Sequence, residues 1–86
     1  MSKTEYIVKS GDIDDMSTVD TFSRYSEAKA AMDQLYQTPC SYYCYERLFN
    51  DEGETLKRSV IWSMLNCSSH FATLKKEGFT SKEIGK

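Results

Sequence analysis

The sequence predicts a small α+β domain: an antiparallel sheet of about four strands in ββαββ order, one main helix packed on it, and a short C-terminal helical segment. Three observations carry this prediction. Segments rich in β-favouring residues lie on both sides of one segment with helical periodicity. The connections within each strand pair are too short for a parallel crossover. The 86 residues, of which 40% are apolar, suffice for a single domain spanning residues 1–86.

The first two strands are expected at residues 4–10 and 16–22. In the first, the apolar side chains alternate, with Tyr6 and Val8 on one face and Ile7 on the other. The second contains threonine and valine, which favour extended backbone. The short acidic connection between the two segments indicates an antiparallel hairpin.

The strongest helical signal lies at residues 26–37. Ser26 is expected to cap this helix by accepting a hydrogen bond from a free backbone N–H of the first turn. Tyr25, just before the cap, is expected to pack on Ala30 as a hydrophobic staple. Pro39 ends the helix, because the residue before a proline avoids helical geometry. The apolar positions in between recur at helical spacing on one face: Ala28, Ala31, Met32, Leu35 and Tyr36.

Two further strands are expected at residues 41–49 and 55–65, joined by a polar turn at 50–54. Apolar side chains occupy both parities near residues 60–65. Burial on both faces is typical of a strand inside a sheet, so we expect the last strand to be a central one.

Tyrosines gather in the third predicted strand. Because successive side chains of a strand point to opposite faces, Tyr42 and Cys44 lie on one face and Tyr43 and Tyr45 on the other. One helix cannot cover both faces of the sheet. The second tyrosine face is therefore exposed, covered by the C-terminal segment, or buried in a partner.

The C-terminal twenty residues differ in character. Residues 69–77 are compatible with a helix, and Gly78 stands where a left-handed residue would end it. Thr80 and Glu83 have the spacing of a capping box, yet too few residues follow for a self-supporting helix. Residues 79–86 are therefore interpreted as a docked or frayed tail.

Composition excludes several classes of protein. No run approaches the roughly 18 consecutive apolar residues of a membrane span, and the N-terminal residues lack the pattern of a secretory signal. We therefore expect a cytoplasmic protein. The net charge is −2 overall, but residues 1–54 carry −6 and residues 55–86 carry +4. We expect the two halves to fold against each other and partly neutralise these charges.

All three cysteines and the single histidine form a candidate zinc set: Cys40, Cys44, Cys67 and His70. Geometry argues against this set, since Cys40 and Cys44 would stand about 13 Å apart along an extended strand. The favoured interpretation is three reduced, partly buried cysteines and no cofactor. A Cys40–Cys67 disulfide is a further alternative, which the odd number of cysteines weakens.

Catalysis is not predicted. Cys67 and His70 are close in sequence, but neither a nucleophile-elbow pattern nor a glycine-rich loop accompanies them. Acidic residues near the first turn lack the glycine and the closing glutamate of a calcium loop. They form a solvated acidic turn that could steer a basic partner.

The leading functional hypothesis is a non-catalytic protein-binding module that acts by occupying a partner's surface, as phage- or mobile-element-encoded inhibitors of host enzymes do. Aromatic side chains anchor such contacts because they bury a large area with few rotatable bonds. Homodimerisation through an exposed strand edge or the same face is also expected. The predicted partner-binding residues are Tyr43, Tyr45, Arg47 and Trp62 as anchors and Asp12, Asp14 and Asp15 for steering.

A nucleic-acid-binding module is the first alternative, since aromatic residues on a sheet face stack bases when basic residues flank them. Its candidate residues are Tyr43, Tyr45, Arg47, Lys57 and Arg58. A small domain stapled by zinc through the four residues above is the second alternative.

Overall fold

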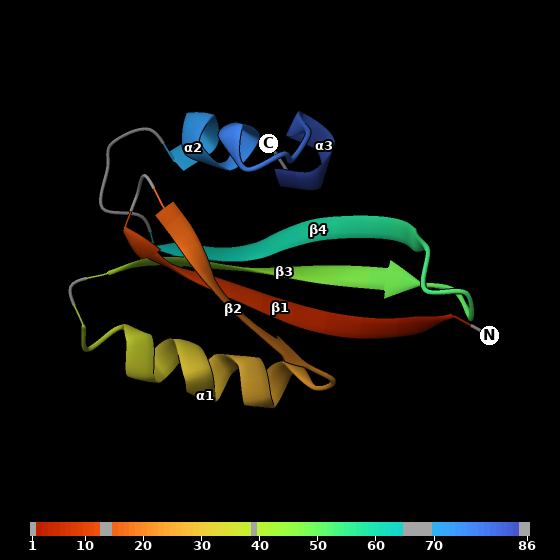
Figure 1. Cartoon of the computed structure of the whole chain (residues 1–86), viewed down its shortest axis with the longest axis horizontal. Helices are drawn as coiled ribbons and strands as arrows, with labels where there is room; N and C mark the ends of the chain where they lie inside the picture. Colours follow the sequence, from red (N-terminus) through yellow and green to blue (C-terminus); the bar gives the residue numbers. More distant parts are fainter. Residues whose placement is uncertain (1, 13–14, 39, 65–69, 85–86) are drawn as a thin grey trace.

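The computed structural model describes residues 2–12, 15–38, 40–64 and 70–84 and has an α+β fold (Figure 1). This confirms the predicted fold class and the ββαββ order, and the C-terminal segment contains two short helices. The elements are β1 (Lys3–Asp12), β2 (Asp15–Phe22), α1 (Tyr25–Leu35), β3 (Ser41–Phe49), β4 (Thr55–Met64), α2 (His70–Lys76) and α3 (Ser81–Ile84).

The four strands form one antiparallel sheet in the order β2-β1-β3-β4. Both predicted hairpins are confirmed, and pairing between β1 and β3 joins them at the centre of the sheet. The expectation that residues 55–65 form a central strand is wrong, because β4 lies at an edge. Ile7 and Val8 of β1 are buried and take the central place.

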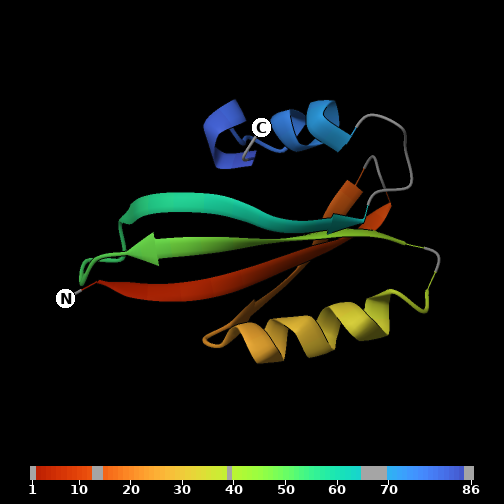
Figure 2. The same cartoon turned by 180° about the vertical axis from the view of Figure 1, so that it is seen from behind.

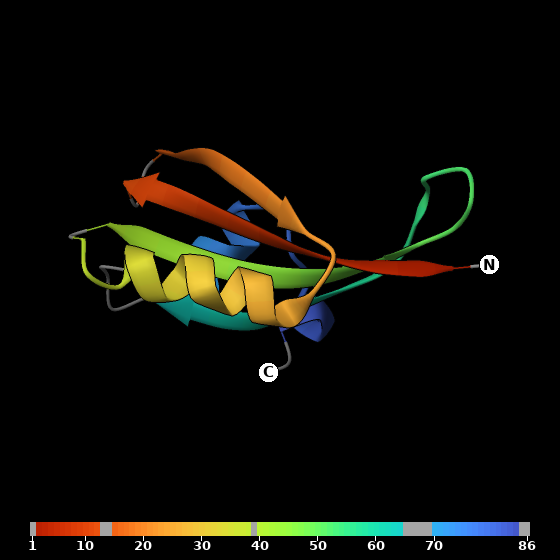
Figure 3. The same cartoon turned by 90° about the horizontal axis from the view of Figure 1, so that it is seen from below.

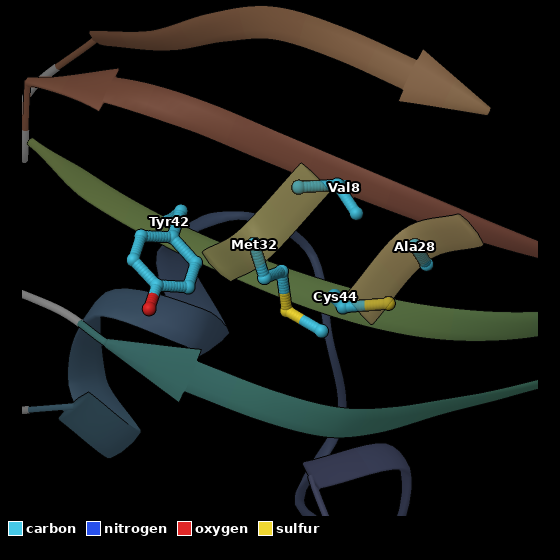
Figure 4. Packing of buried hydrophobic residues seen from close by; sticks show 5 residues of the cluster. All are labelled: Val8, Ala28, Met32, Tyr42 and Cys44. Atoms are coloured by element: carbon cyan, nitrogen blue, oxygen red, sulfur yellow. The ribbon is translucent and has the colours of Figure 1, made fainter. Parts of the chain in front are cut away.

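Helices cover both faces of the sheet. Helix α1 lies against one face, and α2 and α3 lie against the other (Figures 1 and 2). Between α1 and the sheet is a first core, in which Ala28 and Met32 of the helix meet the strand residues Val8, Tyr42 and Cys44 (Figure 4).

A second core fills the space between the sheet and the C-terminal helices. Its buried members are Met16, Tyr43, Leu74 and Phe79. Strand β3 supplies both cores, since Tyr42 and Cys44 belong to the first and Tyr43 to the second. The alternation of side chains along this strand therefore follows the prediction.

Helix α1 begins earlier than expected. Its N-cap residue is Arg24, which makes no side-chain capping hydrogen bond, so the predicted Ser26 cap is wrong. Tyr25 lies inside the first turn and packs its ring on Tyr6 of β1, with 5.7 Å between ring centroids. The predicted role of Pro39 falls on a residue outside the described ones.

The turn between α2 and α3 has the predicted chemistry. Gly78 has φ = 102°, a left-handed conformation that L-residues avoid. The N–H of Gly78 donates to the carbonyl of Lys75, and the N–H of Phe79 donates to that of Leu74, which together make a Schellman motif. The capping box is confirmed too: Thr80 N–H donates to Glu83 Oε1 at 2.8 Å, and Glu83 N–H to Thr80 Oγ1 at 3.3 Å.

Strand β4 is irregular in two places. Its pairing with β3 shifts between Val60 and Trp62 and again between Thr55 and Lys57. Each shift leaves one additional residue on β4, Ile61 in the first case and Leu56 in the second, and both are exposed. Bulges of this kind increase the local twist and interrupt the hydrogen-bonding edge.

Candidate protein-binding surface

The face of β3 that carries Tyr43 and Tyr45 is covered by the C-terminal segment, the second of the three alternatives that the sequence left open. Tyr43 is only 1% exposed. The ring of Phe79 meets Tyr43 edge-on at 5.6 Å and Tyr45 at 5.0 Å between centroids. The side chain of Tyr43, a predicted partner anchor, therefore lies in the core.

Polar contacts hold the C-terminal segment on this face. The Tyr43 hydroxyl donates to Glu77 Oε1 at 3.0 Å, and Lys9 Nζ donates to the same oxygen at 3.1 Å. Burial raises the pKa of Tyr43 above its ordinary value, and the hydrogen bond to Glu77 raises it further. Tyr43 therefore stays neutral and remains a donor far above neutral pH.

Arg58 makes the second attachment. Its guanidinium donates to the Glu83 carboxylate, with Nε 2.8 Å from Oε2, and to the carbonyl oxygen of Gly78. It also lies over the ring of Phe79, 4.5 Å from the centroid. Hydrogen bonds from Arg58 and from the Thr80 backbone lower the pKa of Glu83 to about 2.

The other residues of the predicted nucleic-acid set are divided. Arg47 pairs with Glu5 at 2.6 Å and donates through Nε to Thr55 at 2.6 Å. Lys57 is exposed. Thus the two arginines of this set are held by carboxylates of the chain, and Tyr43 is buried.

The predicted steering residues lie at one end of the sheet. Asp12 ends β1, Asp15 begins β2, and both are exposed. Asp14 is outside the described residues.

Of the ion pairs between described residues, only Lys9–Glu77 joins the acidic and basic halves of the chain. In this pair the acidic half supplies the lysine and the basic half supplies the glutamate.

Cys44 and His70 of the predicted zinc set come from elements on different faces of the sheet. Cys44 is fully buried on the α1 side of the sheet, whereas α2, which begins at His70, lies on the opposite side (Figure 1). Cys67 is outside the described residues. Cys40 and Cys44 are free thiols, and burial raises the pKa of Cys44 to about 11.

Trp62 is the predicted anchor that the structure leaves accessible. Its side chain is 50% exposed on the edge strand β4. Helix α1 packs against β1, β2 and β3, and Figure 3 shows β4 at the margin of the helix. A groove of about 320 Å³ lies here between α1 and Trp62 of β4. We call it the Trp62 groove, and its lining residues are Tyr25, Lys29, Met32, Asp33, Tyr36, Tyr42 and Trp62.

The Trp62 groove has an apolar base and charged sides. Met32 and Tyr42 are buried and form the base, whereas Tyr25, Tyr36 and Trp62 are exposed. Tyr36 is the most open of them, at 68%. Four of the seven residues that line this groove are therefore aromatic.

Lys29 and Asp33 stand on the α1 side of this groove. Their separation of four residues places them one above the other on the same side of the helix. Within the described part of the chain, neither side chain takes part in an ion pair or a hydrogen bond. One positive and one negative charge are thus free to pair with a bound segment.

A second hollow lies on the other side of β4. It measures about 410 Å³ and is lined by Val60, Ile61, Trp62, Ser63, Phe71, Leu74 and Ile84. Trp62 belongs to both hollows, so the edge strand presents apolar side chains between two depressions.

Sequence reasoning missed the helical side of the Trp62 groove. The apolar spacing of α1 places Tyr36 in the buried stripe, yet this residue is exposed. The signal is present as a separate row at helical spacing: Tyr25, Lys29, Asp33 and Tyr36. Aromatic residues that flank a charge pair on an outward row are unusual for a purely solvated helix face.

Comparisons with protein-family models, with curated proteins and with solved structures found no match to this chain. None of the described helices has the length and apolar character required to cross a membrane.

Proposed function

We propose that this chain is a non-catalytic, cytoplasmic protein-binding module and that the Trp62 groove is its binding site. The observation that carries the proposal is the half-exposed Trp62 beside three tyrosines that line the same apolar groove. Tryptophan and tyrosine dominate the energy of protein interfaces when a partner removes them from water. The module acts by occupying a surface of its partner.

The expected ligand is a helical segment of a protein. Strand addition at β4 is disfavoured, since two bulges interrupt this edge and Lys57 is exposed on it. The groove instead runs beside α1, and a helix that presents aromatic side chains can lie along such a strip. Lys29 and Asp33 supply charges for its polar flank.

A screen for helical ligands tests this proposal. The full chain is immobilised and used to select binders from a phage-displayed library of amphipathic helical peptides. We expect Trp62→Ala and Tyr36→Ala each to weaken the selected peptides about tenfold or more, as hot-spot truncations do. Leu56→Ala is the matched control, because Leu56 is an exposed apolar residue of β4 outside the groove. It should leave the affinity unchanged.

Two outcomes contradict the proposal. The first is that the library yields no helical peptide, or only peptides whose affinity is unaffected by Trp62→Ala. The second comes from titration with a single-stranded oligonucleotide at two salt concentrations. The nucleic-acid alternative is favoured if the oligonucleotide binds in a salt-sensitive way, if Lys57→Ala abolishes this binding and if Trp62→Ala leaves it unchanged.

A further inference from the structure

The exposed row on α1 is complementary to itself. It runs from Tyr25 at the start of α1 to Tyr36, the C-cap residue that follows the helix, with Lys29 and Asp33 between them. When two copies of this row meet with the helices antiparallel, Lys29 of one stands opposite Asp33 of the other, and the reverse pair forms at the same time. Tyr25 of each chain then lies near Tyr36 of the other chain.

We propose that the segment bound in the Trp62 groove is α1 of a second copy of this chain. This inference rests on the proposed function and names the partner of the same site. Two α1 helices pack antiparallel across a two-fold axis, and Trp62 of each chain covers the flank of the other chain's helix. Such an interface is isologous, as most homodimer interfaces are.

The charges select the antiparallel arrangement. With parallel helices in register, Lys29 would face Lys29 and Asp33 would face Asp33, which is repulsive in both places. The antiparallel dimer instead gives two attractive pairs between side chains that have no ion-pair partner within the described part of the monomer. Exposed tyrosine and tryptophan rings on either side of these pairs lose their contact with water.

The size of the surface sets the expected strength. Seven residues of each chain line the groove, whereas standard stable interfaces use roughly 20–30 residues a side. We therefore expect a dimer whose population depends on protein concentration. Sedimentation equilibrium of the wild-type chain should show a reversible monomer–dimer equilibrium, and Trp62→Ala should shift it toward monomer.

Two charge variants test the register of this dimer. Lys29→Glu makes the row entirely acidic, and Asp33→Lys makes it entirely basic. Each variant alone should dimerise about tenfold more weakly or worse, because two attractive pairs become repulsive. An equimolar mixture of the two should form a heterodimer, since each carboxylate in the acidic row of one variant then faces a lysine in the basic row of the other. Glu27→Lys is the matched control, as it changes a charge on α1 outside the groove and should leave the dimer intact.

Several results would overturn the inference: a wild-type chain that stays monomeric at all concentrations, single variants that dimerise like the wild type, or a mixture that stays monomeric. Circular dichroism of each variant confirms that it is folded. A monomeric wild type whose helical peptide ligands still depend on Trp62 would refute the dimer and leave the proposed function intact. Dimerisation unaffected by Trp62→Ala would place the dimer on another surface.

Discussion

Cys44 shows how one strand position fixes the chemistry of a side chain. Its thiol lies between the sheet and α1 with no exposed surface, and burial raises its pKa to about 11, which favours the neutral thiol. Cys40, at the margin of the same core, is partly exposed. The two thiols of this C-x3-C pair therefore differ in reactivity, which is not typical of metal ligands.

Thiol labelling should separate these two cysteines. The variant Cys40→Ser/Cys67→Ser keeps only Cys44, and we expect it to react with a disulfide reagent far more slowly than Cys44→Ala/Cys67→Ser, which keeps only Cys40. Burial of the thiol and its raised pKa are the reasons. Absorbance of the released chromophore measures both rates. In denaturant the rates should converge, and equal rates in the folded state would contradict the described packing of Cys44.

Glu83 makes stability depend on pH. Its pKa of about 2 in the folded chain lies below the ordinary value of 4.5. The Arg58–Glu83 interaction therefore contributes fully above about pH 4.5 and is lost as the pH falls toward 2. We expect Glu83→Gln to lower the free energy of unfolding by about 1 kcal/mol at pH 7 and to reduce the acid sensitivity in this window.

Urea denaturation at a series of pH values measures this effect. Glu52→Gln is the control, since Glu52 is exposed in the β3–β4 turn and contacts neither Arg58 nor the C-terminal helices. If the free energy of unfolding of Glu83→Gln falls in acid as it does for the wild type, the Arg58–Glu83 interaction is not the source of the acid sensitivity.

At the scale of the elements, Gly78 allows the chain to turn between α2 and α3 and to place Phe79 in the core. An added Cβ would meet no atom within 4 Å, so only the positive φ opposes a side chain here. We expect Gly78→Ala to destabilise the protein by about 1 kcal/mol. Thermal unfolding followed by circular dichroism measures the change. Asn tolerates this backbone better, so Gly78→Asn should cost less than Gly78→Ala.

The elements also show what the sequence could and could not predict. Local signals located the strands to within a few residues, and the capping box at Thr80 and the role of Gly78 were readable because each depends on neighbours in sequence. The edge position of β4 was not readable. It depends on pairing between β1 and β3, which lie far apart in the chain.

The candidate site was predicted only in part for the same reason. Trp62 could be named as an anchor, but the cover over Tyr43 depends on the docking of Phe79, which no local pattern specifies. The groove needs residues of α1 and β4 to meet across the sheet. Neither arrangement follows from the spacing of residues within one element.

At the scale of the whole molecule, two cores share one sheet. Met32 fills the first and Phe79 the second, and both are buried. Because β3 contributes alternate side chains to both, neither core can be lost without disturbing the strand that supports the other. We therefore expect the molecule to unfold as one cooperative unit.

Truncation of either core tests this cooperativity. Met32→Ala is expected to cost about 2–5 kcal/mol and Phe79→Ala about 3–5 kcal/mol. In both variants, far-ultraviolet circular dichroism and Trp62 fluorescence should report one common midpoint in urea. Leu56→Ala, an exposed truncation, should change the midpoint little. A Phe79→Ala chain that loses its C-terminal helices in a separate, earlier transition would contradict a single cooperative unit.

The alternation of side chains along β3 restricts where residues can be inserted into this chain. Inserting one codon between Tyr42 and Tyr43 would turn every following side chain of that strand to the opposite face of the sheet. Cys44 would be directed toward Phe79, and a tyrosine ring would be forced against Ala28, where only a small side chain fits. An extra codon in the β3–β4 turn, residues 50–54, leaves the alternation along β3 unchanged, because the turn follows the last residue of that strand. Length variation among descendants of this sequence should therefore be found in that turn and be absent from β3.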